Sequence, residues 1–161
     1  MELSILTANM WLLPPPASAD NDLRVGKLVK LIKKKSPDVI NLQEVWLEKY
    51  VTQIKKALPE YFSVSPRSFL YNKSGLLTLM KYKPLKQQFG KFKENNNFSP
   101  LELLASKGYI YTSFKKEGKE FRLINTHLYE TINKTKIAIT INQAKEILSN
   151  ALRHNPTIIA G

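Results

Sequence analysis

The chain has 161 residues, 43% of them hydrophobic and 10% aromatic, which is typical of one globular domain with a packed core and not of a disordered chain. It contains no cysteine, which excludes disulfides, thiolate catalysis and cysteine zinc sites, and no run approaches the ~20 apolar residues of a membrane-spanning helix. The formal net charge of +12 favours polyanionic partners such as nucleic acid, an anionic membrane surface or a phosphate-bearing substrate, and a solvated basic surface without a partner accounts for it equally well.

The N-terminal segment M-E-L-S-I-L-T-A-N-M-W lacks a basic region followed by a long apolar one, so it does not resemble a secretory signal. We therefore expect a cytoplasmic protein, with secretion or membrane association left open, and infer no protein partner. Residues 3–8 form a short apolar run that predicts a β-strand, and the prolines at 14–16 predict a loop after it.

The next segment shows the periodicity of an amphipathic helix. Four apolar residues fall at i, i+3, i+4 and i+7 and so share one helical face: Val25, Leu28, Val29 and Ile32. Asp20 or Asn21 can cap this helix, and the lysines at 33–35 suit the negative end of its dipole.

A second strand and a second helix follow. Ser36-Pro37 ends the first helix, and residues 38–44, D-V-I-N-L-Q-E, predict a buried strand. The second helical stripe, which Pro59 ends, consists of Leu47, Val51, Ile54 and Leu58. The alternation of strand and helix predicts an α/β protein.

The rest of the chain is mostly strands until a final helix. Residues 61–65, 74–82, 85–92, 109–115 and 120–128 are predicted strands, and residues 93–100 a loop. Consecutive strands predict antiparallel pairing, and Gly118 in K-K-E-G-K is expected to take a positive φ in a hairpin turn. The final helix has the stripe Ile137, Ile141, Ala144, Leu148 and Leu152, and a strand at 157–160 follows Pro156.

Two polar residues lie where predicted strands of the first half end. Glu44 ends the run 38–44, where a carboxylate on a rigid strand can bind a hard divalent cation. Taken alone, its position favours an ordinary glutamate in the first turn of the next helix, which stabilises the helix dipole. Asn9 follows the first strand and could bind a phosphate oxygen or orient a metal ligand, although a turn residue is the simpler interpretation.

His127 ends the strand F-R-L-I-N-T-H-L, and alternation places it on one face with Phe121, Leu123 and Asn125. It could donate a proton or a hydrogen bond to a phosphate, or be a structural histidine. The chain has no P-loop, no G-x-G-x-x-G, no nucleophile elbow and no H-E-x-x-H, which disfavours nucleotide-dependent kinases, α/β-hydrolases and zincins.

Several short blocks, taken in order, resemble one superfamily. They are T-A-N-M-W (7–11), N-L-Q-E-V-W (41–46), S-G-L-L-T-L-M (74–80), S-K-G-Y-I-Y (106–111), I-N-T-H-L (124–128), N-Q-A-K-E-I-L (142–148) and T-I-I-A-G (157–161). Together they are similar to the endonuclease/exonuclease/phosphatase superfamily with its deoxyribonuclease-I-like fold. The pattern Asn9, Trp11, Pro14, with E-V-W (44–46) and S-K-G (106–108), is most similar to its neutral sphingomyelinase branch.

The resemblance implies a phosphodiesterase that uses Mg²⁺ or another divalent cation. Glu44 would be the main metal ligand and Asn9 would support the metal site. His127 would contact the scissile phosphate as an acid or electrostatic partner, and Lys107 and Asn125 would contact the substrate. Water would attack the phosphodiester in line, with the metal stabilising the developing charge. The substrate would be a sphingomyelin-type lipid or, alternatively, a nucleic acid.

The resemblance also implies an incomplete four-layer α/β sandwich, roughly its first half, with a mixed β-sheet and flanking helices. In the superfamily an Asp-x-Asn motif and a later Asp-His pair follow the strand similar to T-I-I-A-G. Residues 1–161 are therefore expected to be one truncated domain that is nearly inactive alone. We expect it to supply one sheet and an edge strand of the other, and hence to be marginally stable or prone to aggregate.

Two alternatives to the sphingomyelinase-like enzyme remain at this point. The first is a nuclease of the same fold, which the charge of +12 supports because neutralising phosphates drives non-specific DNA binding. The second is a basic binding module that has kept the scaffold and lost catalysis. Binding to DNA or anionic vesicles without turnover would indicate the latter.

Overall fold

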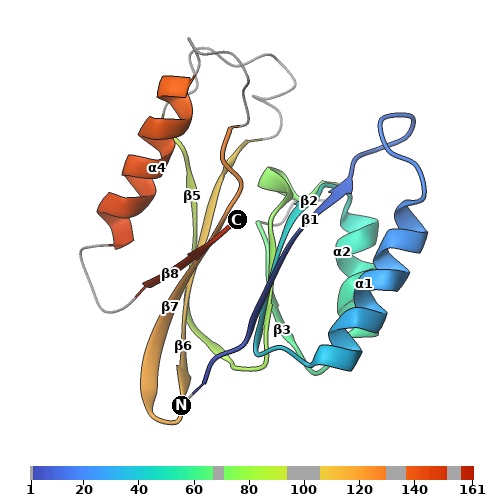
Figure 1. Ribbon diagram of the computed structural model, residues 1–161, viewed down its shortest axis with the longest axis horizontal. Coiled ribbons are helices and arrows are strands. Elements are labelled where there is room, and N and C mark those ends of the chain that lie inside the picture. Colours follow the sequence, from blue (N-terminus) through green and yellow to red (C-terminus); the bar gives the residue numbers. More distant parts are fainter. Residues whose placement is uncertain (1, 67–70, 94–105, 130–136, 152–156) are drawn as a thin grey trace.

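The computed structural model describes residues 2–66, 71–93, 106–129, 137–151 and 157–161, and they form a four-layer α/β sandwich (Figure 1). Two four-stranded sheets have the strand orders β1-β2-β4-β3 and β5-β6-β7-β8. The strands are β1 (Ile5–Leu12), β2 (Val39–Val45), β3 (Phe62–Val64), β4 (Leu77–Met80), β5 (Pro84–Lys91), β6 (Gly108–Lys116), β7 (Lys119–Thr126) and β8 (Thr157–Ala160). The helices are α1 (Asn21–Lys35), α2 (Glu48–Ala57) and α4 (Ile137–Ala151), with a 3₁₀ turn at Lys73–Gly75. Within these segments, no helix is long and apolar enough to span a membrane.

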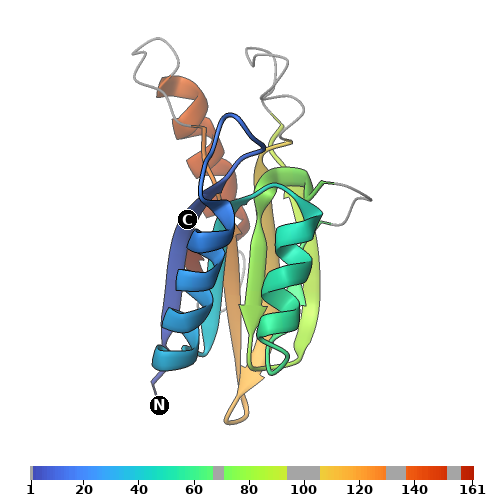
Figure 2. The same cartoon turned by 90° about the vertical axis from the view of Figure 1, so that its right-hand side faces the viewer.

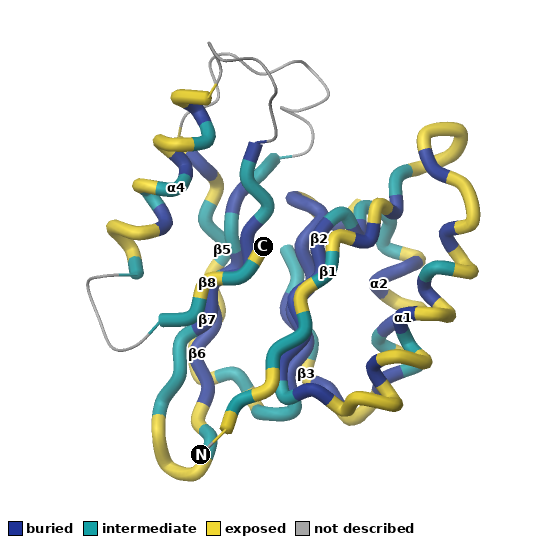
Figure 3. The backbone as a smooth tube through the Cα atoms, viewed as in Figure 1, coloured by how far each residue is buried: buried dark blue, intermediate teal, exposed yellow. Residues whose placement is uncertain are grey.

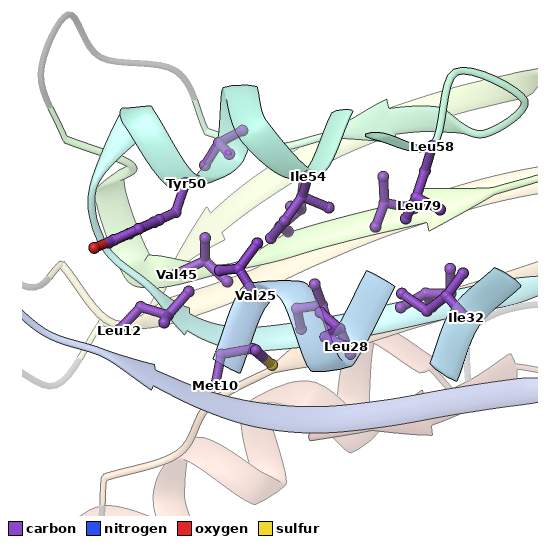
Figure 4. Packing of buried hydrophobic residues seen from close by; sticks show 14 of the residues in the cluster. Met10, Leu12, Val25, Leu28, Ile32, Val45, Tyr50, Ile54, Leu58 and Leu79 are labelled. Carbon is purple, nitrogen blue, oxygen red and sulfur yellow. The ribbon is translucent and has the colours of Figure 1, made fainter. Parts of the chain in front are cut away.

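The first sheet carries α1 and α2 on its outer face, as Figures 1 and 2 show. Strand β1 pairs parallel with β2, while β4 runs antiparallel to both β2 and β3. The two predicted helical stripes point into this layer, where Val25, Ile32 and Ile54 are almost completely buried. Figure 4 shows them packed against side chains of the sheet such as Leu79. The stripe predictions for α1 and α2 are therefore confirmed, because a helix on a sheet buries one face only.

The start of α1 differs in mechanism from the prediction. Asp20 occupies the N-cap position, but its backbone is left-handed (φ 57°) and its side chain makes no capping hydrogen bond. Asn21 is the first helical residue, and its amide donates to the carbonyl of Leu13 at 2.9 Å. The prediction is thus right about where the helix starts and wrong about side-chain capping. The Asn21 side chain bonds to the preceding loop and not to the end of the helix.

The second sheet is an antiparallel meander of β5, β6 and β7, with β8 added parallel to β7. The hairpin between β6 and β7 turns at Glu117 and Gly118, both with positive φ (50° and 79°), which confirms the expected conformation of Gly118. The expectation that consecutive strands pair is wrong at one place, because β4 and β5 belong to different sheets. The short link at 81–83 carries the chain from one sheet to the other. The predicted loop at 93–100 lies almost entirely outside the described residues.

Helix α4 covers the outer face of the second sheet with a different stripe from the predicted one. Ile139, Gln143 and Ile147 are buried, whereas the predicted Ile137, Ile141 and Leu148 are 43–49% exposed. Leu152 lies outside the described residues. The buried face includes a polar contact, in which the side-chain oxygen of Gln143 accepts a hydrogen bond from the backbone N–H of Tyr129 at 2.8 Å. Sequence periodicity alone ranks a glutamine as a surface residue, which explains the error.

The inner faces of the two sheets pack directly on each other, and β2 and β4, the two central strands of the first sheet, are almost entirely buried (Figure 3). Phe114 of β6 is fully buried at this interface and stacks on Tyr82 and Phe121, with ring centroids 5.3 and 5.8 Å apart. Val39 and Met80 of the first sheet belong to the same cluster. The expectation of one sheet plus an edge strand is therefore wrong, since each sheet covers the inner face of the other.

A carboxylate links the two sheets at the end where β2 begins. Asp38 accepts hydrogen bonds from the backbone and hydroxyl of Ser4 (both 3.0 Å) and from the hydroxyl of Tyr82 (2.6 Å), and it pairs with the Lys116 ammonium at 3.0 Å. Burial by itself raises the pKa of Asp38. The hydrogen bonds lower the pKa by more than burial raises it, so the pKa of Asp38 is well below the ordinary aspartate value. The folded protein therefore favours ionised Asp38.

We predict that Asp38→Asn lowers the free energy of unfolding at pH 7 by about 2 kcal/mol, since hydrogen bonds to a charged group contribute roughly 1.5–3 kcal/mol. Because the folded-state pKa is lowered, the contribution is present above the ordinary aspartate pKa of about 3.9 and fades as the pH falls below it. Urea denaturation at pH 7 and pH 3 measures both values. Asp20→Asn, the same change at an exposed carboxylate, is the control. An equal loss at both pH values would contradict the assignment.

Candidate active site

Glu44 lies near the end of β2 and not in a helix. Helix α2 begins four residues later with Glu48, which occupies the helix-start position considered for Glu44. The backbone of Glu44 is left-handed (φ 57°), a conformation that costs a non-glycine residue free energy and is enriched at functional sites. Its side chain is 14% exposed, so the carboxylate is largely shielded yet still reachable from solvent.

Asn9 of β1 lies beside Glu44 and holds it. Its side-chain amide donates a hydrogen bond to Oε1 of Glu44 at 2.7 Å, and its own oxygen accepts one from the backbone N–H of Trp11 at 3.0 Å. The β1–β2 register shifts between Asn9 and Leu12, so the strand is irregular at this point. The structure therefore makes Asn9 a direct partner of Glu44 and not merely a turn residue.

His127 approaches the same carboxylate from the other sheet. It is the first residue after β7, and its Nε2 lies 3.7 Å from Oε1 of Glu44. The predicted alternation is confirmed, because Phe121 and Leu123 of the same strand pack against the first sheet. Asn9 lies inside β1, which continues to Leu12, so the expectation that Asn9 follows the first strand is wrong. Glu44 lies near the end of β2 and His127 directly follows β7, and packing the two sheets brings the three residues together.

A network of buried hydrogen bonds connects the two strands that carry Glu44 and His127. Gln43 donates to the side-chain oxygen of Asn125 at 2.8 Å and to the hydroxyl of Thr7 at 3.2 Å. The amide of Asn125 donates to the carbonyls of Leu42 and Leu77 in the first sheet. Since Gln43 directly precedes Glu44 and Asn125 lies two residues before His127, the network fixes both strand ends relative to each other.

The predicted substrate contact of Asn125 does not fit its position. Its side chain is completely buried and its polar atoms bond to the first sheet, so no surface of it faces a ligand. Gln43 was not singled out from the sequence, although an amide inside the apolar run V-I-N-L-Q-E was a usable signal. Buried amides need partners, and two sheets packed face to face supply them.

Lys107 lies beside the segment that follows His127. Its ammonium donates to the carbonyl of Leu128 at 3.0 Å and lies 5.7 Å from the ring centre of Tyr129. From the other side, α4 binds the same segment, because the hydroxyl of Thr140 donates to the carbonyl of Tyr129 at 2.7 Å. Lys107 therefore holds the segment that follows His127.

A hollow of about 470 Å³ opens next to His127. Its walls are the segment after β7 and the end of β8: Thr126, His127, Leu128, Tyr129, Ile159, Ala160 and Gly161. Among the described residues, no three His, Cys, Asp or Glu side chains cluster as a metal site. A single carboxylate still suits Mg²⁺, which keeps several waters and takes one or two carboxylates together with substrate phosphate oxygens. Glu44, with only Oε1 engaged among the described residues, fits that requirement.

Comparison with known proteins agrees with this architecture. "Putative neutral sphingomyelinase" of Drosophila melanogaster is 29% identical over 136 residues, which are 80% of this chain and 30% of that protein. Solved structures that match 98% of this chain include a β-hairpin deletion mutant of β-toxin from Staphylococcus aureus (TM-score 0.81, 20% identity), sphingomyelinase C from Streptomyces griseocarneus (0.79, 17%) and a humanized D. rerio TDP2 (0.73, 20%).

The chain is shorter than the proteins it matches. It spans 30% of the Drosophila melanogaster protein and 59–65% of the three solved chains. At identities of 17–20% these structures establish the fold alone. The sequence model of the Endonuclease/Exonuclease/phosphatase family matches residues 6–161, almost the whole chain. The chain therefore belongs to the endonuclease/exonuclease/phosphatase family and has its deoxyribonuclease-I-like fold.

Proposed function

We propose that this chain carries the metal-binding part of a Mg²⁺-dependent phosphodiesterase that acts on sphingomyelin-type lipids. The observation that carries the proposal is that Glu44 lies within 2.7 Å of Asn9 and 3.7 Å of His127, side chains that come from three different strands or strand ends. Similarity to the Drosophila melanogaster protein and to sphingomyelinase C supports the choice of substrate. Two of the three groups can serve a phosphodiester directly: a carboxylate for the cation and an imidazole for the phosphate.

The residues would act as follows. Glu44 would hold the divalent cation, which supplies charge stabilisation to the phosphoryl oxygens when bound. Asn9 orients the Glu44 carboxylate through its 2.7 Å hydrogen bond. His127 would donate a hydrogen bond or a proton to a phosphate oxygen. Lys107 is proposed as a weaker substrate contact, because its ammonium lies on the segment that follows His127.

We further propose that the groups that orient and deprotonate the attacking water lie C-terminal to Gly161. The matched proteins extend well beyond the length of this chain, which supports the idea. Sequencing the coding DNA past the codon for Gly161 tests it. An open frame that begins with Asp-x-Asn and reaches a later Asp-His is expected, whereas a stop codon would contradict it and favour a binding module.

Substrate choice is tested with sphingomyelin vesicles and supercoiled plasmid, each with Mg²⁺ and with EDTA. Sphingomyelin should be cleaved only with Mg²⁺, and the 161-residue chain alone should turn over far more slowly than a polypeptide that contains the following segment. Plasmid nicking with sphingomyelin untouched would assign a nuclease instead, a possibility supported by the net charge and by the fold match to D. rerio TDP2 with a single-strand DNA product. A normal enzymatic rate from the 161-residue chain would contradict the missing water-activating groups.

His127→Ala should reduce Mg²⁺-dependent hydrolysis by roughly 10²–10³-fold, the size of effect seen when one group that stabilises the transition state is removed. The KM should change little, since the imidazole is proposed to act on the reacting phosphate. The comparison variant is His127→Asn, which keeps a hydrogen-bond donor and should recover part of the rate. An unchanged kcat in His127→Ala would remove this residue from the mechanism.

A further inference from the structure

Trp11 is an exposed aromatic residue attached directly to the candidate site. Its side chain is 55% exposed, and its backbone N–H donates to Asn9, which in turn holds Glu44. The backbone of Trp11 has φ 48°, and a bulky residue rarely adopts this left-handed conformation. Such strain persists only where the surroundings enforce it, and it is enriched at functional positions.

The loop between β1 and α1 enforces this conformation. The carbonyl of Trp11 accepts hydrogen bonds from the hydroxyl of Ser18 (2.8 Å) and from the guanidinium of Arg24 (3.3 Å). The same guanidinium lies 5.5 Å from the Trp11 ring centre and donates to Asn21 at 2.7 Å. The indole ring is thus presented to solvent from a rigid support, which lowers the entropy cost of binding through it.

The segment that begins at Trp11 carries no charge although the chain is strongly basic. Residues 11–19, W-L-L-P-P-P-A-S-A, contain no charged side chain, whereas 24% of the whole chain is charged. The prolines at 14–16 are exposed, and Leu23 in the first turn of α1 is 57% exposed. Figures 1 and 2 show this loop projecting at the end of the first sheet to which β1 and β2 point. We call Trp11, Pro14, Pro15, Pro16 and Leu23 the apolar tip.

The chemistry of the apolar tip fits a lipid surface better than a nucleic acid. Tryptophan prefers the boundary between head groups and acyl chains, and neighbouring apolar residues add buried area there. Stacking on nucleobases would call for cations beside the ring to meet the phosphates. The cation in contact with the ring is Arg24, and its guanidinium is engaged with Trp11, Ser18, Ala19 and Asn21.

We propose that the apolar tip docks on a phospholipid bilayer and so brings Asn9, Glu44 and His127 to the head-group phosphates. The inference rests on the proposed lipid phosphodiesterase function and adds the surface through which that site reaches its substrate. The hydrogen bond from Trp11 to Asn9 joins the docking residue to the site without an intervening mobile segment. Docking is an equilibrium property, so it can be tested without turnover.

The test uses the full 161-residue chain with phosphatidylcholine vesicles at physiological salt. Neutral vesicles remove the bulk attraction between a basic protein and anionic lipid. Trp11→Ala should weaken co-sedimentation roughly tenfold, since it withdraws one large aromatic side chain from the interface. Phe62→Ala is the matched control, because Phe62 is also an exposed aromatic (46%) but lies in β3 opposite Met80, away from the site.

A second readout does not depend on affinity. Trp46→Phe leaves Trp11 as the only tryptophan, and vesicles should then shift its emission to shorter wavelength. Vesicle binding that Trp11→Ala leaves unchanged, no binding at all, or an emission change with a single-stranded oligonucleotide instead of vesicles would each overturn the proposal. Trp11-dependent vesicle binding by a protein that cleaves no lipid would support the docking surface and reject only the proposed function.

Discussion

Glu44→Gln should abolish measurable Mg²⁺ binding and reduce Mg²⁺-dependent phosphodiester hydrolysis by roughly 10²–10³-fold. The substitution removes the negative charge while keeping the size of the side chain and an oxygen that Asn9 can bind. The fold should persist, because glutamine has nearly the same shape as glutamate, and the polar partners of the Glu44 carboxylate among the described residues are Asn9 and His127. Isothermal calorimetry with Mg²⁺, followed by rates in the longest natural polypeptide that contains this chain, measures both effects.

Glu60→Gln is the matched control, since Glu60 is exposed and lies outside the site. It should leave both Mg²⁺ binding and rate unchanged. Asn9→Ala should have a Mg²⁺ affinity and a rate between those of Glu44→Gln and Glu60→Gln, because Glu44 keeps its charge but loses the amide that orients it. If Glu44→Gln binds Mg²⁺ as tightly as the unmodified chain, the cation is held elsewhere and the proposed mechanism is wrong.

Phe114→Ala should lower the free energy of unfolding by about 3–5 kcal/mol, the usual cost of deleting a fully buried aromatic side chain. Phe114 lies between the sheets, and its loss also removes the stacking on Tyr82 and Phe121. A domain has roughly 5–15 kcal/mol in total, so the variant should be close to unfolded at 37 °C. Thermal and urea denaturation of the unmodified chain and of Phe114→Ala measures the difference in the free energy of unfolding.

Phe62→Ala, which changes the same residue type at an exposed position, should cost less than about 1 kcal/mol. A small effect of Phe114→Ala would mean that the sheets are not packed on each other in solution. The same experiment bears on the expected marginal stability of the chain. That expectation assumed an uncovered inner sheet face, whereas in the structure the second sheet covers it. A cooperative unfolding transition in the unmodified chain would show that the expectation of marginal stability is wrong.

The order of the elements was predictable because each carries a local pattern. The helical stripes of α1 and α2 and the positive φ of Gly118 follow from short-range periodicity and turn chemistry, and the structure confirms them. The division of strands between two sheets was not predictable in the same way. Nothing local distinguishes the link at 81–83, which crosses between sheets, from a hairpin that pairs β4 with β5.

The candidate site shows the same division. Asn9, Glu44 and His127 could be singled out because polar residues at strand ends are exceptions to the apolar pattern, and ordered motifs linked them to a family. Asn9 and Glu44 are 35 residues apart in the sequence, and this number alone does not say that their side chains are in contact. Asn125 was misjudged as a substrate contact and Gln43 was missed, because each side chain has a hydrogen-bond partner in the opposite sheet.

The sequence alone determined the composition of this protein, its alternation of strands and helices, its family and the residue types available for binding a cation and a phosphate. These properties depend on local periodicity and on motif order. The tertiary structure decided which residues share a surface. Packing two sheets face to face buried Asn125 and brought Glu44 next to His127. Docking of α4 on the outer face of the second sheet turned its Gln143 face inward, and Trp11 stayed exposed beside the site. Long-range contacts have no sequence period, so only the folded chain reveals them.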